Sequence, residues 1–236
     1  MRFYEVGGCV RDSLMGLTSK DVDFAVEAES FEVMEAELKA RGFKVFLSTP
    51  EFLTIRAQVP SSEKELLART KVADFVLCRK DSASGDGRRP DFVEPGTILD
   101  DLARRDFTMN AIALDVKTGE VLDPHEGRED IECGVLKFVG EPERRIAEDG
   151  LRVLRALRFM VTKEMSPDHK TRSALYSELA VQMLLKVSVE RVREELEKMF
   201  AFDSVRAMAL LADGFPVLLP AIFRDGLRLM PTLKSV

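Results

Sequence analysis

The sequence predicts an α+β protein, with a mixed α/β domain over residues 1–138 followed by a smaller all-helical domain over 139–236. Three observations support this fold class. Before residue 138, short apolar runs are separated by glycine and polar turns, which is typical of strands. After it, apolar residues recur with the helical period. The length of 236 residues is sufficient for two domains that each bury a core.

Strands and helices alternate through the first domain. A helix is expected over 30–41, because Ser30 is a suitable N-cap and Phe31, Met34 and Leu38 share one face at helical spacing. A short helix is expected from Gly8 to about Gly16. Strands are expected at 2–6, around the aspartates at 21 and 23, and at 44–48, 51–59 and 72–78.

The rest of the chain is expected to be mostly helical. The polar stretch "RKDSASGDGRRP" at 79–90 is expected to be a functional loop, since it has no periodicity and is rich in small and charged residues. Residues 100–114 have a helical pattern, and one strand-and-turn unit follows to about 139. No strand is expected beyond it, and helices are expected over 142–162 and 188–200.

Composition restricts the class of protein. Hydrophobic residues make up 45% and charged residues 32%, which is typical of a globular protein in water. No apolar run approaches the roughly 20 residues that span a bilayer, so neither a membrane segment nor a leader peptide is expected. The three cysteines are widely spaced, which indicates a reducing, cytoplasmic location. The net charge of −6 argues against a generally basic surface, although clustered arginines permit a local nucleic-acid site.

The stretch "GGCVRDSLMGLTSKDVDF" at 7–24 combines two features of nucleotide chemistry. Asp21 and Asp23 are expected to point to one face of a strand, and Asp74 lies on another predicted strand, so these carboxylates are candidate ligands for Mg²⁺. A D-x-D pair alone is more often a surface accident. Here it follows Gly7 and Gly8, whose backbone N–H groups can approach a phosphate at a helix N-terminus, with Arg11 one turn later. The candidate metal-binding and phosphate-binding residues are therefore Gly7, Gly8, Arg11, Asp21, Asp23 and Asp74.

The stretch "EDGLRVLRALRF" at 148–159 places Asp149, Arg152 and Arg155 opposite an apolar arc, with Arg158 at its edge. The ordinary interpretation is a solvated helix face with ion pairs. The sharper interpretation is base reading: an aspartate accepts from the amino group of cytosine or adenine while an arginine donates to the ring nitrogen. Uracil and guanine reverse that order, so such a pair would select C and A.

The stretch "RRDFTMNA" at 104–111 is a third candidate. Arg104 or Arg105 is suited to a triphosphate, with Asp106 as its orienting residue and Asn110 at helical spacing. A structural ion pair explains the same pattern equally well.

Together these motifs resemble the class II tRNA nucleotidyltransferase (CCA-adding enzyme) and bacterial poly(A) polymerase family, within the polymerase-β superfamily. In addition to the three stretches above, "DPHEGREDI" at 123–131 resembles the segment that joins the head to the neck, and "SVERVREELEKMF" at 188–200 resembles the later neck motif. Family members continue into body and tail domains, of which "GFPVLLPAIF" resembles only the beginning.

The resemblance implies a polymerase-β-like nucleotidyltransferase head with a mixed sheet, followed by an all-helical neck. It implies Mg²⁺ on Asp21 and Asp23, with Asp74 as a third catalytic carboxylate, and base reading by Asp149 and Arg152. The nucleotide-binding residues expected on this basis, together with those from spacing, are Gly7, Gly8, Arg11, Arg105, Asp106, Asn110, Asp149, Arg152, Arg155 and Arg158.

The implied reaction is in-line attack of an RNA 3′-hydroxyl on the α-phosphate of CTP or ATP, with release of pyrophosphate and without a covalent intermediate. The expected partners are therefore the tRNA 3′ end, CTP and ATP, with no membrane and no protein partner. Addition of CC alone, of A alone or of poly(A) to other RNAs is the alternative, and the loop at 79–90 does not discriminate among them. A non-catalytic RNA- or nucleotide-binding remnant is a further alternative.

Overall fold

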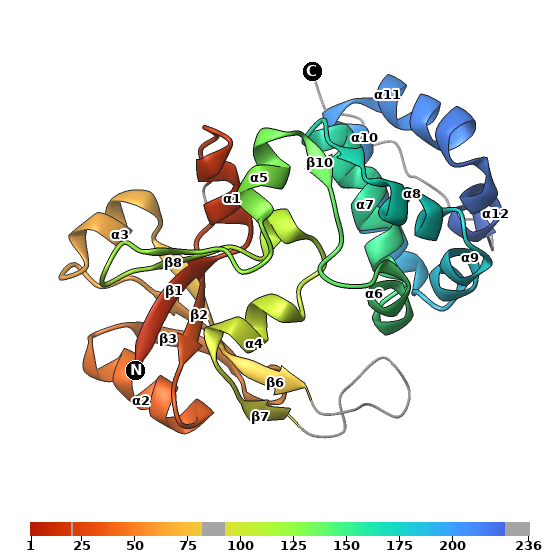
Figure 1. Cartoon of the computed structure of the whole chain (residues 1–236). Helices are drawn as coiled ribbons and strands as arrows, with labels where there is room; N and C mark the ends of the chain where they lie inside the picture. Colours follow the sequence, from red (N-terminus) through yellow and green to blue (C-terminus); the bar gives the residue numbers. More distant parts are fainter. Residues whose placement is uncertain (20, 82–92, 225–236) are drawn as a thin grey trace, which may run out of the picture. The chain divides into compact units, whose positions relative to one another are not determined.

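The computed structural model describes residues 1–19, 21–81 and 93–224 (Figure 1). The chain forms two compact units, Met1–Cys133 and Gly134–Val236. The first is built on a mixed sheet and the second is mainly helical, which confirms the predicted α+β class. The expected division into a head at 1–138 and a neck at 139–236 remains a prediction about function.

The first unit contains a seven-stranded sheet with the order β3-β4-β5-β2-β1-β8-β9. Its β2–β5 pair is parallel and its other pairs are antiparallel, as expected for a mixed sheet. The strands are β1 (Arg2–Val6), β2 (Asp23–Glu27), β3 (Lys44–Thr49), β4 (Thr54–Gln58), β5 (Val72–Leu77), β8 (Ala113–Asp115) and β9 (Val121–Leu122). The strands expected at 2–6, 44–48, 51–59 and 72–78 are therefore confirmed.

Alternation along the strands separates an apolar face of this sheet from a polar one. Phe24 and Phe75 belong to one buried cluster and stack with ring centroids 5.1 Å apart. Helix α2 (Phe31–Ala40) contributes Phe31, Met34 and Leu38 to the same cluster, and Ser30 accepts a hydrogen bond from the Val33 N–H at 3.3 Å. Both the cap and the apolar face of this helix were predicted from sequence. The neighbouring strand positions Asp23 and Asp74 point to the opposite, polar face.

Four other α-helices lie in the described part of the first unit, and two sequence predictions about residues 79–114 are wrong. The helices are α1 (Gly8–Leu14), α3 (Lys64–Arg69), α4 (Ile98–Ala103) and α5 (Gly127–Glu132). Residues 79–81 are not loop, because β6 (Arg79–Asp81) pairs with β7 (Val93–Pro95). The rest of the predicted loop, 82–90, lies outside the described residues. The expected helix over 100–114 ends at Ala103, where burial of Phe107, Met109 and Ile112 in irregular backbone overrides the local helical pattern.

The second unit is helical apart from one very short strand pair. β10 (Val135–Leu136) pairs in parallel with β11 (Ser166–Pro167), which corrects the expectation of no strand beyond 139. Two residues are too few to show a strand period. The α-helices are α6 (Pro142–Glu148), α7 (Leu151–Thr162), α8 (His169–Leu175), α9 (Glu178–Leu185), α10 (Val189–Phe202), α11 (Ser204–Ala209) and α12 (Leu219–Ile222).

No single helix within the described part of the chain has the length and apolar character needed to cross a bilayer, although the bent pair Ser204–Gly214 and Pro216–Ile222, with a 91° bend, meets those criteria jointly.

Replacing Phe75 by alanine tests the importance of the apolar cluster. Phe75 is 1% exposed and contacts the rings of Phe3, Phe24 and Phe43. Because truncation loses burial and leaves a cavity, we expect the free energy of unfolding to fall by about 3–5 kcal/mol. Urea denaturation followed by circular dichroism measures the change. Phe46→Ala, at a side chain that is 56% exposed, is the matched control and should change stability by no more than about 0.5 kcal/mol.

Candidate active site

Two aspartates of the first unit face each other across the parallel strand pair. Asp23 on β2 is in register with Asp74 on β5. Asp21 precedes the strand, so the expectation that both aspartates of the D-x-D motif lie within it is wrong. The ladder loosens there: the Asp74 N–H still reaches the Val22 carbonyl, but at 3.4 Å. Asp23 therefore lies at the start of β2, two residues after Asp21, while Asp74 lies within β5.

Burial and neighbouring charges act together on Asp23. Burial is the largest effect that raises the pKa of its carboxyl, and the charges of Asp74 and Asp21 raise it further. Arg105 and Arg56 oppose this by lowering the same pKa. Three carboxylates thus concentrate negative charge that a bound cation would offset.

Arg56 is a functional neighbour that sequence reasoning missed. It lies on β4, in register with Asp74, and its Nε and Nη2 donate to the two Asp74 oxygens at 2.8 and 2.9 Å. Nothing in the sequence reveals this contact, because it depends on the pairing register of two strands. Asp74 is therefore placed beside Asp23 as predicted but already accepts a bidentate guanidinium.

The carboxylates do not form a closed metal cage. Among the residues that the structure describes, no group of three or more His, Cys, Asp or Glu side chains is arranged to hold a metal ion. Magnesium usually keeps several waters and binds through one or two carboxylates plus substrate phosphates. Asp21 and Asp23 fit that coordination chemistry, since they supply two carboxylates at neighbouring positions of the chain.

The glycine turn lies beside Arg105. Gly7 has φ +72°, and a Cβ at this position would lie 2.9 Å from the Arg105 Nη1. Glycine therefore allows both the left-handed backbone and the close approach of the guanidinium. Helix α1 begins at Gly8, and no side chain among the described residues caps this end. The predicted phosphate cradle and Arg105 are thus brought together.

Arg105 is held by Asp101, a second residue that the motifs did not identify. Asp101 on α4 is 2% exposed, and its Oδ2 accepts from the Arg105 Nε at 3.1 Å and Nη2 at 2.9 Å. Its Oδ1 accepts from the Arg104 Nε at 3.2 Å. The Arg105 Nη1 donates to the Asn110 carbonyl at 3.2 Å. The spacing of Asp101, Arg104 and Arg105 at i, i+3 and i+4 is the sequence signal that would have found this pairing.

Arg11, Asn110 and Asp106 form a buried chain of hydrogen bonds. The Arg11 Nη1 donates to the Asn110 Oδ1 at 2.7 Å, and the Asn110 Nδ2 donates to the Asp106 Oδ1 at 2.9 Å. Asn110 belongs to a 3₁₀ turn, Thr108–Asn110, so the helical spacing assumed for Asp106 and Asn110 is not the reason they meet. This arrangement favours an orienting role toward Arg11 for both residues.

The predicted base-reading stretch of the second unit is interrupted. Asp149 has extended backbone, φ −153° and ψ 108°, between α6 and α7, so it does not lie on one continuous helix with Arg152. A Cβ on Gly150 would lie 2.2 Å from the Met183 carbonyl oxygen of α9, which explains why glycine occurs at the break. The helical apolar period continues across this break, and therefore the sequence did not reveal it.

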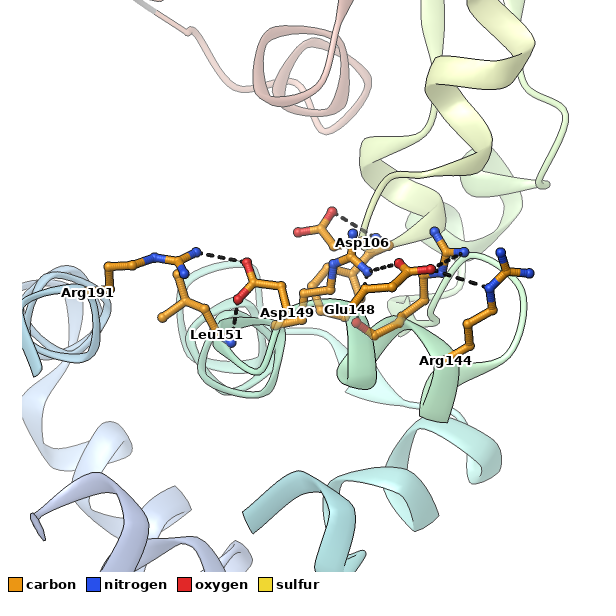
Figure 2. A network of polar contacts seen from close by, with 9 residues as sticks. Asp106, Arg144, Glu148, Asp149, Leu151 and Arg191 are labelled. Carbon is orange, nitrogen blue, oxygen red and sulfur yellow. Dashed lines mark hydrogen bonds and ion pairs between the residues drawn. The ribbon is translucent and has the colours of Figure 1, made fainter. Parts of the chain in front are cut away.

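Asp149 and Arg152 have separate partners. The Asp149 Oδ1 accepts from the Leu151 N–H at 3.0 Å, and its Oδ2 accepts from the Arg191 Nη2 at 2.8 Å (Figure 2). The Arg152 Nη1 donates to the Glu148 Oε2 at 2.7 Å and to the Arg145 carbonyl at 2.9 Å. The two predicted base readers are thus ordered by neighbours within the second unit.

Arg155 and Arg158 are half-buried and do not form the solvated face of the ordinary interpretation. Their guanidinium carbons lie 5.6 and 4.1 Å from the centre of the Phe159 ring. The Arg158 Nε donates to the Glu195 Oε2 at 2.6 Å, and Glu195 is 4% exposed. Glu195 is a further contact that sequence reasoning did not predict.

Comparison with known proteins gives consistent matches. The profile of the family described as the Poly A polymerase head domain matches residues 3–137. A CCA-adding enzyme of Lactobacillus delbrueckii subsp. bulgaricus is 36% identical, over 98% of this chain and 56% of that protein. The chain therefore spans about half the length of the curated relatives it matches.

Solved structures give the same picture. The Bacillus stearothermophilus CCA-adding enzyme in complex with CTP is similar with a TM-score of 0.75 and 32% identity, over 95% of this chain and 51% of that one. A tRNA nucleotidyltransferase complexed with a primer tRNA and an incoming ATP analogue is similar with a TM-score of 0.74 and 28% identity, over 94% of this chain and 59% of that one.

The acid dependence of stability tests the contact between Asp101 and its arginines. Burial acts to raise the pKa of the Asp101 carboxyl, but Arg105 and Arg104 outweigh it and hold the pKa below its ordinary value. A lowered pKa stabilises the folded chain at pH values above the unfolded pKa of about 4, and this contribution disappears as the pH falls through the folded pKa. Asp101→Asn should therefore lower the free energy of unfolding by about 1–3 kcal/mol at pH 7 and by less at pH 3.

Urea denaturation at both pH values measures this difference. Glu65→Gln, at an exposed position on α3, is the control and should have no effect at either pH. An equal loss of stability at pH 7 and pH 3 would contradict the role assigned to the Asp101 charge.

Proposed function

The chain belongs to the Poly A polymerase head domain family, and we propose that it is a nucleotidyltransferase that adds C and A from CTP and ATP to tRNA 3′ ends and releases pyrophosphate. The observation that carries the proposal is the placement of Asp23 beside Asp74, with Arg105 close to both Asp23 and the Gly7 turn. The names of the relatives support CCA addition as the outcome. The family match also confirms the resemblance inferred from the sequence motifs.

The residues of the first unit suit nucleotidyl transfer from a nucleoside triphosphate. Asp21 and Asp23 would hold Mg²⁺. When bound, this cation would neutralise phosphate charge and make the attacking hydroxyl oxygen a better nucleophile. Gly7 and Gly8 leave room for a phosphate near the backbone, while Arg105 and Arg11 supply positive charge to the triphosphate. The 3′-hydroxyl of the RNA attacks the α-phosphorus, loses its proton, and displaces pyrophosphate.

The roles of three polar residues follow from their contacts. Asp106 and Asn110 act by orienting Arg11, through the buried hydrogen bonds that join them. Asp74 is proposed as the third carboxylate. Because both of its oxygens accept from Arg56, this role requires Arg56 to share or release one of them.

The second unit supplies base selection in this proposal. Asp149 accepts from the amino group of cytosine or adenine, and Arg152 donates to the ring nitrogen beside it. Arg155 and Arg158 add positive charge for the nucleotide. A cytoplasmic location belongs to the same proposal, and the three free cysteines support it.

Poly(A) addition, or addition of CC or A alone, is the second candidate. The family description names poly A polymerase, and the chain corresponds to about half of the curated CCA-adding relatives. These activities use the same chemistry and differ in RNA substrate and in the point at which addition stops.

Incorporation of labelled CTP and ATP with Mg²⁺ tests the proposal. The substrates are tRNA transcripts that end before the first C, before the second C or before the terminal A, with an intact tRNA and an unrelated RNA as controls. Addition that stops at CCA supports tRNA repair, and long A tracts on any RNA support a poly(A) polymerase. A folded protein that binds CTP but incorporates nothing would overturn the enzymatic proposal and favour a binding remnant.

Asp21→Ala should abolish catalysis without unfolding the protein. Removing one carboxylate from the proposed Mg²⁺ site should reduce incorporation by about 100-fold or more, the loss typical of removing one electrostatic contact to a transition state. Steady-state incorporation measures the rate, and circular dichroism checks the fold. Glu51→Ala, at an exposed acid of the same unit, is the control and should retain full activity.

Asp149→Ala and Arg152→Ala should relax the choice of base more than they affect the fold. A bidentate contact to a base provides about 1–3 kcal/mol of discrimination, so the preference for CTP over UTP should fall by about 10-fold or more. The ratio of kcat/KM for the two nucleotides measures this. An unchanged ratio in both variants would contradict base reading by this pair.

A further inference from the structure

We propose that Arg191, on helix α10, is a positioning residue that sets the orientation of the Asp149 carboxylate and thereby takes part in nucleotide selection. This inference rests on the proposed function, because it extends the base-reading role of Asp149 to a residue on another helix. Arg191 lies in the stretch at 188–200 that resembles the later neck motif, but the sequence alone assigns this residue no individual role.

The contacts of Asp149 show why it depends on a partner. Asp149 lies in the extended backbone between α6 and α7, where its N–H donates to the Arg145 carbonyl at 3.3 Å and its carbonyl accepts from the Arg152 N–H at 3.1 Å. These contacts hold the backbone but leave the direction of the carboxylate to its side-chain partners. Its Oδ1 accepts from the Leu151 N–H at 3.0 Å, and its Oδ2 accepts from the Arg191 Nη2 at 2.8 Å. Figure 2 shows the carboxylate between these two donors.

Two donors from different elements define the plane of this carboxylate. The terminal torsion of an aspartate is broad, so a single hydrogen bond leaves the direction of the second oxygen weakly determined. Leu151 fixes one oxygen, and Arg191 fixes the other. A carboxylate accepts about four hydrogen bonds in total, so these two contacts leave acceptor capacity for a base amino group.

The exposure of the pair favours orientation over stability as its contribution. The side chains of Arg191 and Asp149 are 39% and 34% exposed. Ion pairs with this degree of exposure contribute little to folding. The same contact still determines where an acceptor oxygen points, and that matters for a site that discriminates between bases by the order of donor and acceptor.

Helix α10 contacts a second predicted nucleotide-binding residue one turn later. Glu195 follows Arg191 by four residues, so both project from neighbouring positions of one helix face. Glu195 accepts from the Arg158 Nε at 2.6 Å. On one face of α10, Arg191 therefore orients Asp149. Glu195 on the same face holds Arg158, so this face supports the α6–α7 stretch at two points.

Arg191→Ala tests the inference through selectivity. The preference for CTP over UTP, and for ATP over GTP, should fall by about tenfold, measured both as kcat/KM ratios and as ratios of equilibrium dissociation constants. Arg191→Lys should restore part of the preference, because an ammonium donates to the same oxygen without the planar geometry. The thermal midpoint of Arg191→Ala should stay close to that of the wild type.

Arg206→Ala is the matched control. Arg206 forms a comparable exposed ion pair with Glu164 at 2.6 Å in the same unit, and it has no contact to Asp149 among those described. Its loss should leave both selectivity ratios unchanged. An Arg191→Ala variant that keeps the wild-type ratios, or that loses selectivity no more than Arg206→Ala, overturns the positioning role.

The two readouts separate this inference from the proposed function. Absence of incorporation by the wild type overturns the enzymatic proposal, whereas the binding ratios still test Arg191. Wild-type protein that binds CTP and UTP equally overturns the inference directly. Selective wild type together with an equally selective Arg191→Ala variant overturns the inference alone.

Discussion

The candidate active site depends on two like charges in register across a parallel strand pair. Asp23 faces Asp74, and burial together with the charge of Asp74 raises the pKa of the Asp23 carboxyl. Arg105 and Arg56 lie close enough to lower the pKa of Asp23, and they come from the segment after α4 and from β4. The sheet order and the segment after α4 are therefore both required for this site. Such an arrangement costs stability and is typical of places where charge is used for chemistry.

Three arginines that are proposed to bind the nucleotide are each held by an acidic side chain. Arg105 is held by Asp101, Arg152 by Glu148 and Arg158 by Glu195, each through a charge-assisted hydrogen bond of about 3 Å or less. A long side chain that is already ordered loses less conformational entropy when it meets a ligand. A guanidinium also has five donors, so one carboxylate partner does not exhaust its capacity. The acids thus pre-organise these arginines for the proposed contact with a nucleotide.

The sequence predicted the α+β class, most strands of the sheet and the helix capped by Ser30, because each depends on a local period or a local cap. The sequence also identified residues that belong to one motif, such as Gly7 and Gly8, as parts of one site. It failed over 100–114 and at the Asp149–Gly150 break, where the apolar period continues although the helix ends. The close approach of α9 leaves room only for glycine at residue 150, which is a tertiary constraint without a local signal.

The partners of the site residues were the least predictable part for the same reason. Arg56 meets Asp74 through strand register, and Arg191 meets Asp149 across 42 residues of sequence. Neither contact follows from a motif, since a motif identifies which side chains do chemistry but not what fixes them. Asp101 and Glu148 could have been predicted from sequence, because each lies three or four residues before the arginine that it contacts.

The proposed catalytic and base-selecting residues belong to different compact units, and this has a physical consequence. The carboxylates and the glycine turn are ordered by the sheet of the first unit, whereas Asp149 and Arg152 are ordered by α6, α7 and α10 of the second. Under the proposed function, the residues for chemistry and the residues for base choice are therefore ordered by different sets of neighbours, one in the sheet and one among the helices.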